Sequence, residues 1–598
     1  MRYNTFNCKR FLAMLVATAI ATMALYSQTS PNGKIAVKAA GKNGFAIYHN
    51  SNESKPTKLA VIECGNIKKT VAGGTHTTEY DMLTGKRSHC TNAYSEAMYV
   101  LADGDTLTVR AWNDGVAWRG THDSRINLSG ATHNWLAEWS DGYEAFFPAD
   151  RNVTEGNRFC YPALFEFSSE KNTPIFLLLS ESGIDRNYAA SSLHATATPG
   201  TFALKPDGPE MPGWQTAIIG SLAEIVESTL IADNSAPSQI KDTSWIHPGV
   251  ASWVYWAYNH GSENYDIVCK YIDLAATLKL PYVFIDADWD KMGNGKNILD
   301  AVGYAKEKGI KPMIWYNSSV GWIDGAPGPK FRLNKPEDRE REFAWCEQNG
   351  IVGVKVDFFS GDTNLNIRYM AELLECAARH NLLVNFHGAT IPRGWHRTYP
   401  NLMSVEGVYG AEWYNNVPTF TDKAARHNAT LPFTRNVIGP MDYTPCAFSD
   451  SQHPHITTHA HELALTVLYE SGIQHLADRP ESFLAQPEYI RNFLTQLPNA
   501  WDDTKLIGGY PGDYAVIARR KGNNWWIAGI NGNDTVREIP LDFNKTGITN
   551  DYNNKKITLI ADYSKGKDSK WEIRTIKDLP QIIRLQPRGG FIITIQEL

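Results

Sequence analysis

Short apolar stretches separated by Gly, Asn, Asp and Pro fill the chain from residue 28 to residue 247. Stretches such as GFAIYHN, TPIFLLLSES and TAIIG have the length of β-strands, and turn-forming residues bound them. The pattern predicts a large N-terminal β-sandwich domain over residues 28–247.

From Pro248 onward, strand-like segments alternate with segments of helical period such as 263–280, 299–308 and 364–379. Eight strand candidates fit within residues 248–498, and this number matches a (β/α)8 barrel of about 250 residues. The candidates are ASWVYWA, YVFIDADW, KPMIWYN, GVKVDFF, LLVNFHG, LMSVEG, the segment around TRNVIGPMDY, and IQHLADRP. We therefore expect a catalytic TIM barrel over residues 248–498.

Strand patterns return over residues 499–598, in YAVIARRKGNNWWIAGING and GGFIITIQEL, without a long helical period. These residues predict a C-terminal antiparallel β-sandwich domain. The fold class is then multidomain α/β plus all-β, with an N-terminal β-sandwich, a central (β/α)8 TIM barrel and a C-terminal β-domain.

The first residues have the pattern of a targeting segment. Arg2, Lys9 and Arg10 give a positive start, and an uncharged apolar run follows from Phe11 to Tyr26. This run is short for a membrane span, which needs about 20 apolar residues. We therefore expect a signal peptide over residues 1–27, export across the inner membrane, a periplasmic location and no integral membrane segment after cleavage.

Composition narrows the possible partners. The chain has 58 Lys+Arg against 64 Asp+Glu, a net charge of -6, and no basic cluster, which argues against nucleic acid. The scattered cysteines form neither a disulfide framework nor a zinc motif. In contrast, 18 Trp, 27 Tyr and 23 Phe supply many flat faces that could stack on sugar rings.

Polar residues end the predicted barrel strands, where the active site of such a barrel lies. They are Asp286 and Asp288 after strand two, Lys355 and Asp357 at strand four, His387 after strand five, Glu406 after strand six, and Asp442 and Asp478 near strands seven and eight. Two carboxyl groups beside a glycosidic bond can protonate the leaving oxygen and attack the anomeric carbon. Aldolases and metal-dependent hydrolases also carry acids at strand ends, so this pattern alone leaves those classes open.

Several segments, taken in order, resemble the signature segments of glycoside hydrolase family 97. They are LLLSESGIDRNY, PGWQTAIIG, YIDLAATLKLPYVFIDADW, GVKVDFFSGD, NFHGATIPRGWHRTYPNLMSVEGVYGAEW and GPMDYTP. The resemblance covers most of the mature chain. It implies a bacterial exo-acting α-glycosidase with Ca²⁺ in the active site, either an inverting α-glucosidase or a retaining enzyme.

The residue that ends strand four separates the two branches of this family. The retaining branch has an aspartate there as nucleophile, and this sequence has Asp357, whereas His387 stands about where the inverting branch places a base glutamate. Retention requires the acid/base carboxyl to lie ~5–5.5 Å from the nucleophile. A purely structural role is the alternative for Asp357, which could cap the next helix or pair with Lys355.

The resemblance also assigns the acid/base and the calcium ligands. Glu412 matches the proton donor, Glu406 matches a calcium ligand, and Glu181 of LLSESG matches a calcium ligand supplied by the N-terminal domain. The roles of Glu406 and Glu412 are exchangeable, so both count as candidate ligands for Ca²⁺, which takes six to eight oxygen atoms. The alternative for Glu181 and Glu406 is an exposed loop carboxylate without a functional role.

Five further residues are candidates for contact with the sugar. Lys355 points to the same strand face as Asp357, Asp286 and Asp288 share one face, and Trp315 and His387 lie near strand ends. A salt bridge at the barrel rim or a helix cap would equally explain the two aspartates. A lone strand histidine such as His387 is as often a core residue.

The sequence therefore predicts a retaining exo-acting α-glycoside hydrolase, with α-galactosidase as the first choice. A β-L-arabinopyranosidase, an inverting α-glucosidase and an inactive carbohydrate-binding protein are the alternatives. The expected partner is an oligosaccharide or glycoside, and the sequence leaves the oligomeric state open.

Overall fold

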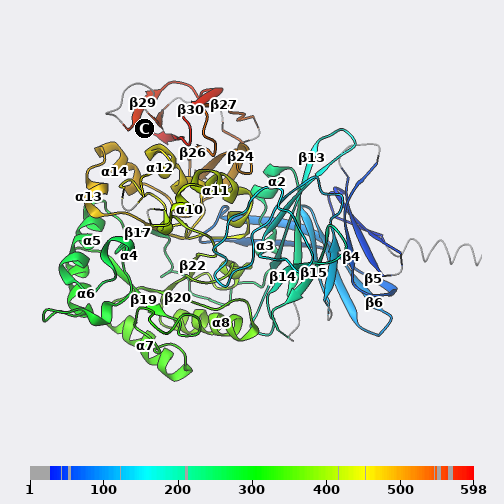
Figure 1. Cartoon of the computed structure of the whole chain (residues 1–598), viewed down its shortest axis with the longest axis horizontal. Helices are drawn as coiled ribbons and strands as arrows, with labels where there is room; N and C mark the ends of the chain where they lie inside the picture. The colour runs from blue at the N-terminus through cyan, green and yellow to red at the C-terminus, as the bar shows by residue number, and fades with distance from the viewer. Residues whose placement is uncertain are drawn as a thin grey trace, which may run out of the picture.

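The chain folds into three blocks of secondary structure that follow one another in the sequence (Figure 1). The computed structural model describes residues 27–598 except 42, 51–54, 121–122, 209–212, 415, 451–452, 545, 549–553 and 563–569. The predicted signal peptide lies outside the described residues apart from its last position. No helix among the described residues is long and apolar enough to cross a membrane.

The first block is a sandwich of two eight-stranded sheets. One sheet has the order β1-β2-β3-β4-β9-β15-β14-β11 and the other β10-β12-β13-β16-β8-β7-β6-β5. The strands are β1 (Ser27–Thr29), β2 (Ile35–Ala39), β3 (Gly44–His49), β4 (Thr57–Glu63), β5 (Ile67–Asp81), β6 (His89–Leu101), β7 (Thr106–Trp112), β8 (Gly115–Arg119), β9 (Ser124–Asn127), β10 (His133–Trp135), β11 (Arg158–Phe159), β12 (Ala163–Ser168), β13 (Pro174–Ser182), β14 (Ser191–Ala195), β15 (Thr201–Pro206) and β16 (Trp214–Gly220). Phe45 of the first sheet meets Trp118 of the second edge to face, with ring centroids 6.2 Å apart. The rings join the two sheets in one core.

Two short helices, α2 (Leu222–Glu227) and α3 (Leu230–Asp233), lead from the sandwich to the barrel. Strand β13 is buried along its length after Pro174, and its last residues face polar groups of the barrel. The sequence of a strand that is buried on both faces is typically a continuous apolar run, and PIFLLL in β13 has this pattern. The sandwich therefore packs directly against the catalytic block.

The second block is a nearly closed barrel of parallel strands in the order β22-β21-β20-β19-β18-β17-β23. The strands are β17 (Gly249–Trp253), β18 (Tyr282–Ile285), β19 (Lys311–Asn317), β20 (Gly353–Asp357), β21 (Leu383–Phe386), β22 (Leu402–Val405) and β23 (Ile473–Leu476). The helices are α4 (Trp256–Asn259), α5 (Tyr265–Thr277), η1 (Trp289–Lys291), α6 (Ile298–Glu307), α7 (Pro336–Asn349), α8 (Asn364–Arg379), α9 (Trp395–Thr398), η2 (Ala411–Trp413), α10 (Pro418–Thr421), α11 (Ala424–Thr430), η3 (Leu431–Phe433), η4 (Arg435–Ile438), α12 (His459–Leu468), α13 (Pro480–Leu484) and α14 (Glu488–Thr495). The predicted TIM-like barrel is confirmed.

The seventh predicted strand is not formed as a strand. Residues 435–438 are a 3₁₀ helix, and Gly439 has a φ of 139°, which an L side chain rarely adopts. Pro440 follows and has no N–H for a strand ladder. The chain still passes through the expected position, because Met441 forms an isolated parallel bridge with Val405.

The third block is an antiparallel sheet of order β24-β25-β26-β31-β28-β29 with a separate β27-β30 pair. Its strands are β24 (Asp503–Tyr510), β25 (Tyr514–Lys521), β26 (Asn524–Asn531), β27 (Arg537–Pro540), β28 (Lys555–Ala561), β29 (Glu572–Ile576), β30 (Ile582–Leu585) and β31 (Gly590–Glu597). Helix α12 packs on β26 and β31. The approach is so close that a Cβ at Gly590 would lie 2.6 Å from the Cα of His461.

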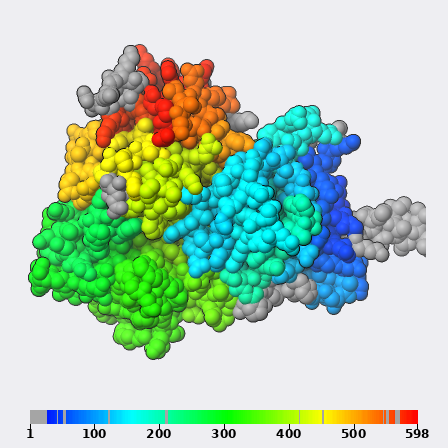
Figure 2. All heavy atoms as spheres, viewed as in Figure 1, coloured from blue at the N-terminus to red at the C-terminus, as the bar shows by residue number. Residues whose placement is uncertain are grey.

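Polar contacts join the three blocks into one body, whose coloured surfaces abut in Figure 2. Tyr510 of the third block donates to Glu166 of the sandwich over 2.7 Å, and Lys505 pairs with Glu227 over 3.0 Å. The buried Arg519 donates to the carbonyls of Val467 and Leu468, at 2.7 and 2.8 Å. It satisfies two acceptors at the carboxyl end of α12, where a cation is favourable.

We expect Arg519→Met to lower the melting temperature by several degrees. The substitution leaves the two carbonyls without a donor, and each buried unsatisfied polar group costs about 1–3 kcal/mol. Arg520→Met is the matched control, because Arg520 is the next residue of β25. Its half-exposed guanidinium lies 3.9 Å from Asp502, and an ion pair of this kind contributes little to the free energy of unfolding. Equal melting temperatures for the two variants would contradict this role of Arg519.

Candidate active site

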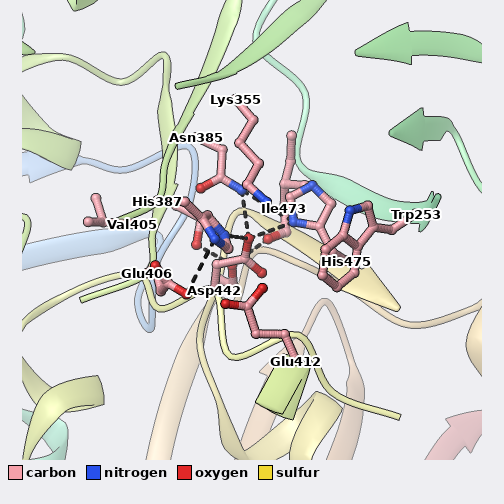
Figure 3. Close-up of polar contacts among 12 residues, drawn as sticks. Trp253, Lys355, Asn385, His387, Val405, Glu406, Glu412, Asp442, Ile473 and His475 are labelled. Atoms are coloured by element: carbon pink, nitrogen blue, oxygen red, sulfur yellow. Dashed lines mark hydrogen bonds and ion pairs between the residues drawn. The ribbon is translucent and has the colours of Figure 1, made fainter. Parts of the chain in front are cut away.

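The polar residues that follow the barrel strands converge at one rim (Figure 3). The strands are parallel, so their carboxyl ends meet at the same edge. The side chains brought together are Asp286, Lys355, Asp357, Asn385, His387, Glu406, Asp442 and His475, with Glu412 on η2. All of them are buried.

Asp357 ends β20 and is held by three groups. Its Oδ1 accepts the N–H of Phe358 at 2.8 Å, and its Oδ2 accepts the indole N–H of Trp315 at 3.0 Å. The ammonium of Lys355 lies 3.6 Å from Oδ2. Burial raises the pKa of Asp357, and the charges of Lys355 and His387 oppose that rise. The carboxylate is thus fixed in direction by its donors.

Lys355 stands between two carboxylates. Its Nζ lies 3.4 Å from Oδ2 of Asp286 and 3.6 Å from Oδ2 of Asp357. Burial alone would lower the pKa of the ammonium, but these two aspartates raise it above the usual range. Asp286 also accepts the indole N–H of Trp253 at 2.7 Å. Lys355 therefore remains a cation directly beside Asp357.

His387 links two carboxylates on opposite sides of its ring. Its Nε2 lies 2.7 Å from Asp442 Oδ2, and its Nδ1 lies 3.4 Å from Glu406 Oε1. Burial opposes a charge on the ring, yet the pKa of His387 is well above its usual value because Glu406 and Asp442 favour the imidazolium. The structure gives the site a second buried cation.

Asp442 is the centre of a network that sequence reasoning missed. Its Oδ2 accepts from Asn385 at 2.6 Å and from His387 at 2.7 Å, and it lies 2.5 Å from His475 Nδ1. These contacts hold the pKa of Asp442 well below its ordinary value, despite its burial. The alternation of Asn385 and His387 on one strand face was the available signal for part of this network.

Glu406 and Glu412 differ in their surroundings. Glu406 accepts the N–H of Gly388 at 2.7 Å, and although burial works against ionisation, His387 holds its pKa below the usual range. Glu412 is held by the indole N–H of Trp256 at 3.0 Å. Burial first, and then the charge of Glu406, raise the pKa of Glu412 to about 8. One carboxyl is thus kept ionised and the other protonated at neutral pH.

Glu144 is a further acid of this site, and sequence reasoning missed it. It lies on the loop between β10 and β11 of the N-terminal sandwich. Burial raises its pKa well above the usual value, and the charges of Glu406, Glu412 and Asp357 add to that rise. No strand-end position marks this loop residue in the sequence, so only the packing of the sandwich on the barrel reveals it.

Glu181 is placed in a different cluster. Its carboxylate accepts the N–H of Ser191 at 2.8 Å and the Nε–H of Arg393 at 3.0 Å. Arg393 also lies 2.9 Å from Asp362 and so ties β13 of the sandwich to the barrel. Among the described residues, three groups of side chains bring possible metal-ligand atoms within 4.8 Å of one another, and the group that holds two glutamates of this rim is His387, Glu406 and Glu412. Neither Glu181 nor Glu144 belongs to any of the three groups.

Asp288 and Trp315 each bind a partner within the protein, and their predicted contact with the sugar stays a prediction. The Asp288 carboxylate accepts the N–H of Gly328 at 2.7 Å and pairs with Lys291 at 2.9 Å. This is the rim salt bridge that the sequence left open as its alternative. Trp315 is buried and directs its indole N–H at Asp357, so it orients the carboxylate from behind.

Comparison with known proteins identifies the family of this site. Family models match the glycosyl-hydrolase 97 N-terminal domain over residues 29–237, glycoside hydrolase 97 over 245–408, and the glycosyl-hydrolase 97 C-terminal, oligomerisation domain over 500–596. A probable retaining α-galactosidase of Streptomyces bingchenggensis is 36% identical over 468 residues, 73% of this chain and 69% of the relative. The chain belongs to glycoside hydrolase family 97. It is a glycosidase.

Three further proteins are similar to this chain. A retaining α-galactosidase of Bacteroides thetaiotaomicron is 30% identical over 422 residues, 66% of this chain and 61% of that protein. A solved β-arabinopyranosidase superposes with a TM-score of 0.82 at 26% identity, covering 95% of this chain and 99% of its own. A family 97 enzyme of Pseudoalteromonas in complex with acarbose has the same fold, with a TM-score of 0.79 at 21% identity over 96% of this chain and 100% of that chain.

We expect Asp442→Asn to lower kcat/KM of this glycosidase by about 10–100-fold. The amide takes away the charge that holds His387 and His475, and small displacements at a catalytic centre have costs of this size. Steady-state kinetics together with circular dichroism would separate lost activity from lost folding. Asp290→Asn is the control, because Asp290 lies at the rim 3.8 Å from Arg332 and outside the network. Unchanged kinetics in Asp442→Asn would show that the network does not orient the site.

Proposed function

We propose that the chain is a retaining exo-acting α-glycoside hydrolase, with α-galactosides as its first substrate class. The observation that carries this proposal is Asp357, a carboxylate at the end of β20 that Trp315 and Lys355 orient into the rim. The names of the relatives from Streptomyces and Bacteroides support the retaining assignment.

In the first step, Asp357 attacks the anomeric carbon and forms a bond to it while the glycosidic C–O bond breaks. Glu412 gives its proton to the departing oxygen, so the leaving group departs as an alcohol. The pKa of about 8 for Glu412 supports this role, because a general acid must hold its proton near neutral pH. The charge of Lys355 opposes the rise that burial gives to the pKa of Asp357, and so favours the carboxylate form before the attack.

In the second step, the ionised Glu412 takes a proton from water as the water oxygen attacks the anomeric carbon. The bond to Asp357 breaks, and the aspartate leaves as a carboxylate. Two inversions give net retention of the anomeric configuration. His387 and Lys355 offset the charge that returns to Asp357.

We also propose a Ca²⁺ site at Glu144 and Glu406, with Glu412 beside them. Glu406 and Glu412 bring ligand oxygens within 4.8 Å of each other, and the half-buried Glu144 interacts with the charges of both. Carboxylate oxygens of this kind suit a hard cation with oxygen ligands. We propose Glu144 as a ligand in place of Glu181, because Arg393 binds the Glu181 carboxylate. A bound Ca²⁺ would supply positive charge near the departing oxygen.

The alternatives to an α-galactosidase are supported to different degrees. A β-L-arabinopyranoside differs from an α-galactoside in the exocyclic CH₂OH group, and the solved β-arabinopyranosidase makes it the second candidate. An inverting α-glucosidase is disfavoured because Asp357 is present and oriented. Both candidate catalytic carboxyl groups are in place, which argues against an inactive binding protein.

We further propose export of the chain to the periplasm, on the N-terminal pattern alone.

We expect Asp357→Gly to lose activity by on the order of 10⁴-fold, because the covalent intermediate can no longer form. Azide should restore turnover and give a glycosyl azide of opposite anomeric configuration to the substrate. The assay uses nitrophenyl α-galactoside, β-L-arabinopyranoside and α-glucoside. The substrate with the highest kcat/KM in the wild type identifies the preferred sugar. Proton NMR of the first product of the wild type is the check: an inverted anomer would remove Asp357 from the nucleophile role.

We expect a chelator to suppress turnover and added Ca²⁺ to restore it. Glu144→Gln should weaken calcium binding measured by titration calorimetry at least about 10-fold, because one charged ligand is lost. Glu181→Gln is the matched variant: it should retain calcium affinity and lower the melting temperature, because Arg393 loses a buried partner. The reverse outcome, calcium lost in Glu181→Gln alone, would restore Glu181 as the ligand.

A further inference from the structure

A pocket of about 880 Å³ lies where the three blocks of the chain meet. The sandwich supplies Trp139, Glu144 and Phe146 to its wall, the barrel block supplies Tyr409 and Arg426, and the C-terminal block supplies Asn533. This volume is within the range of pockets that hold small ligands. None of the steps described above uses this space.

One wall of the pocket adjoins the proton donor. Glu144 lines the pocket, and Gly142 of the same loop packs on Gly388, whose N–H donates to Glu406. A Cβ at Gly142 would lie 3.6 Å from the Cα of Gly388. Tyr409 lines the pocket as well. The Tyr409 ring lies 6.2 Å from the ring of Trp413, the residue after Glu412. The Trp413 ring lies 5.4 Å from the ring of Trp256, whose indole N–H donates to Glu412 at 3.0 Å. The pocket therefore begins on the side of the site where Glu412 lies.

In a double displacement, the nucleophile and the acid act on opposite faces of the anomeric centre. The leaving group departs on the face where the acid donates its proton. A space that opens beside Glu412 is thus the space into which the leaving part of the substrate extends. This step rests on the proposed function, in which Glu412 is the acid.

The lining of the pocket suits a neutral sugar chain. Aromatic rings of Trp139, Phe146 and Tyr409 offer flat faces. Four basic and four acidic side chains line the pocket, so it has no net attraction for a charged ligand: Arg151, Lys423, Arg426 and Arg588 against Glu138, Glu144, Asp422 and Asp534. Arg151 pairs with Glu138, and Arg588 pairs with Asp534.

We propose that this three-block pocket binds the leaving-group portion of the substrate, a neutral oligosaccharide that continues beyond the scissile bond. The N-terminal and C-terminal blocks then determine which chain lengths the enzyme prefers. Simple glycosides, which do not reach Arg426 and Asn533, would use only part of the available binding energy.

The test compares two substrates that carry the same reacting sugar. The glycosyl fluoride has no leaving sugar, whereas a trisaccharide carries two sugar residues on the leaving side; both use the monosaccharide that the wild type prefers. Arg426→Ala removes an exposed side chain that donates to Asn533 at 3.3 Å, and Thr535→Trp fills the pocket from an exposed position. Neither residue belongs to the catalytic groups.

We expect kcat/KM for the trisaccharide to fall about 10-fold in both variants, while the value for the fluoride stays within about twofold. Arg520→Ala, at an arginine of the C-terminal block outside the pocket, should change neither value. Equal losses on both substrates, or no loss on the trisaccharide, would overturn the proposal. If the wild type hydrolyses neither substrate, the proposed function itself fails, and this result is distinct from failure of the pocket assignment.

A second readout does not depend on turnover. In an Asp357→Gly background, titration calorimetry should give about 10-fold weaker binding of the trisaccharide when Arg426→Ala is added. Binding of the free monosaccharide should be unchanged. Equal affinity of the trisaccharide in both proteins would contradict the pocket assignment.

Discussion

The active site depends on how buried negative charge is balanced. Asp357, Glu406, Glu412 and Asp442 are all withdrawn from water, and a buried carboxylate is costly unless a cation or several donors accompany it. Lys355 and His387 supply this compensation unequally. Because Glu406 and Asp442 lie on either side of His387, they ionise readily, and Glu412 is left with a raised pKa. The positions of the two cations thus determine which of these chemically similar acids have lowered pKa values and which have raised ones.

The same balance extends to the N-terminal sandwich. Two of its glutamates reach toward the barrel and have different roles. Glu181 pairs with Arg393 and fixes β13 against the barrel, whereas Glu144 brings a further carboxyl group, with a raised pKa, to the acids of the rim. Tyr143, next to Glu144, donates to Asp362, which Arg393 also binds. The structural ion pair and the catalytic loop are therefore coupled through adjacent residues.

The periodic features of the sequence predicted most of the fold. The helix expected over 364–379 is α8 with the same bounds, and the helix expected over 299–308 differs from α6 by one residue at each end. The seventh strand was wrong because Gly439 and Pro440 override the apolar pattern around them. The alternation along β20 and β21 correctly brought Lys355, Asp357 and His387 to one rim. Glu144 could not be found this way, since an irregular loop has no period and its neighbours in space come from another domain.

The loop of residues 138–150 has a consequence for engineering. TIM barrels are often treated as portable modules whose specificity is changed by exchanging the loops that follow their own strands. In this chain an acid of the rim enters from a segment more than a hundred residues before the first barrel strand. A barrel transplanted without that segment would fold around an incomplete set of acids, so the unit that can be recombined between such proteins is the sandwich and the barrel together.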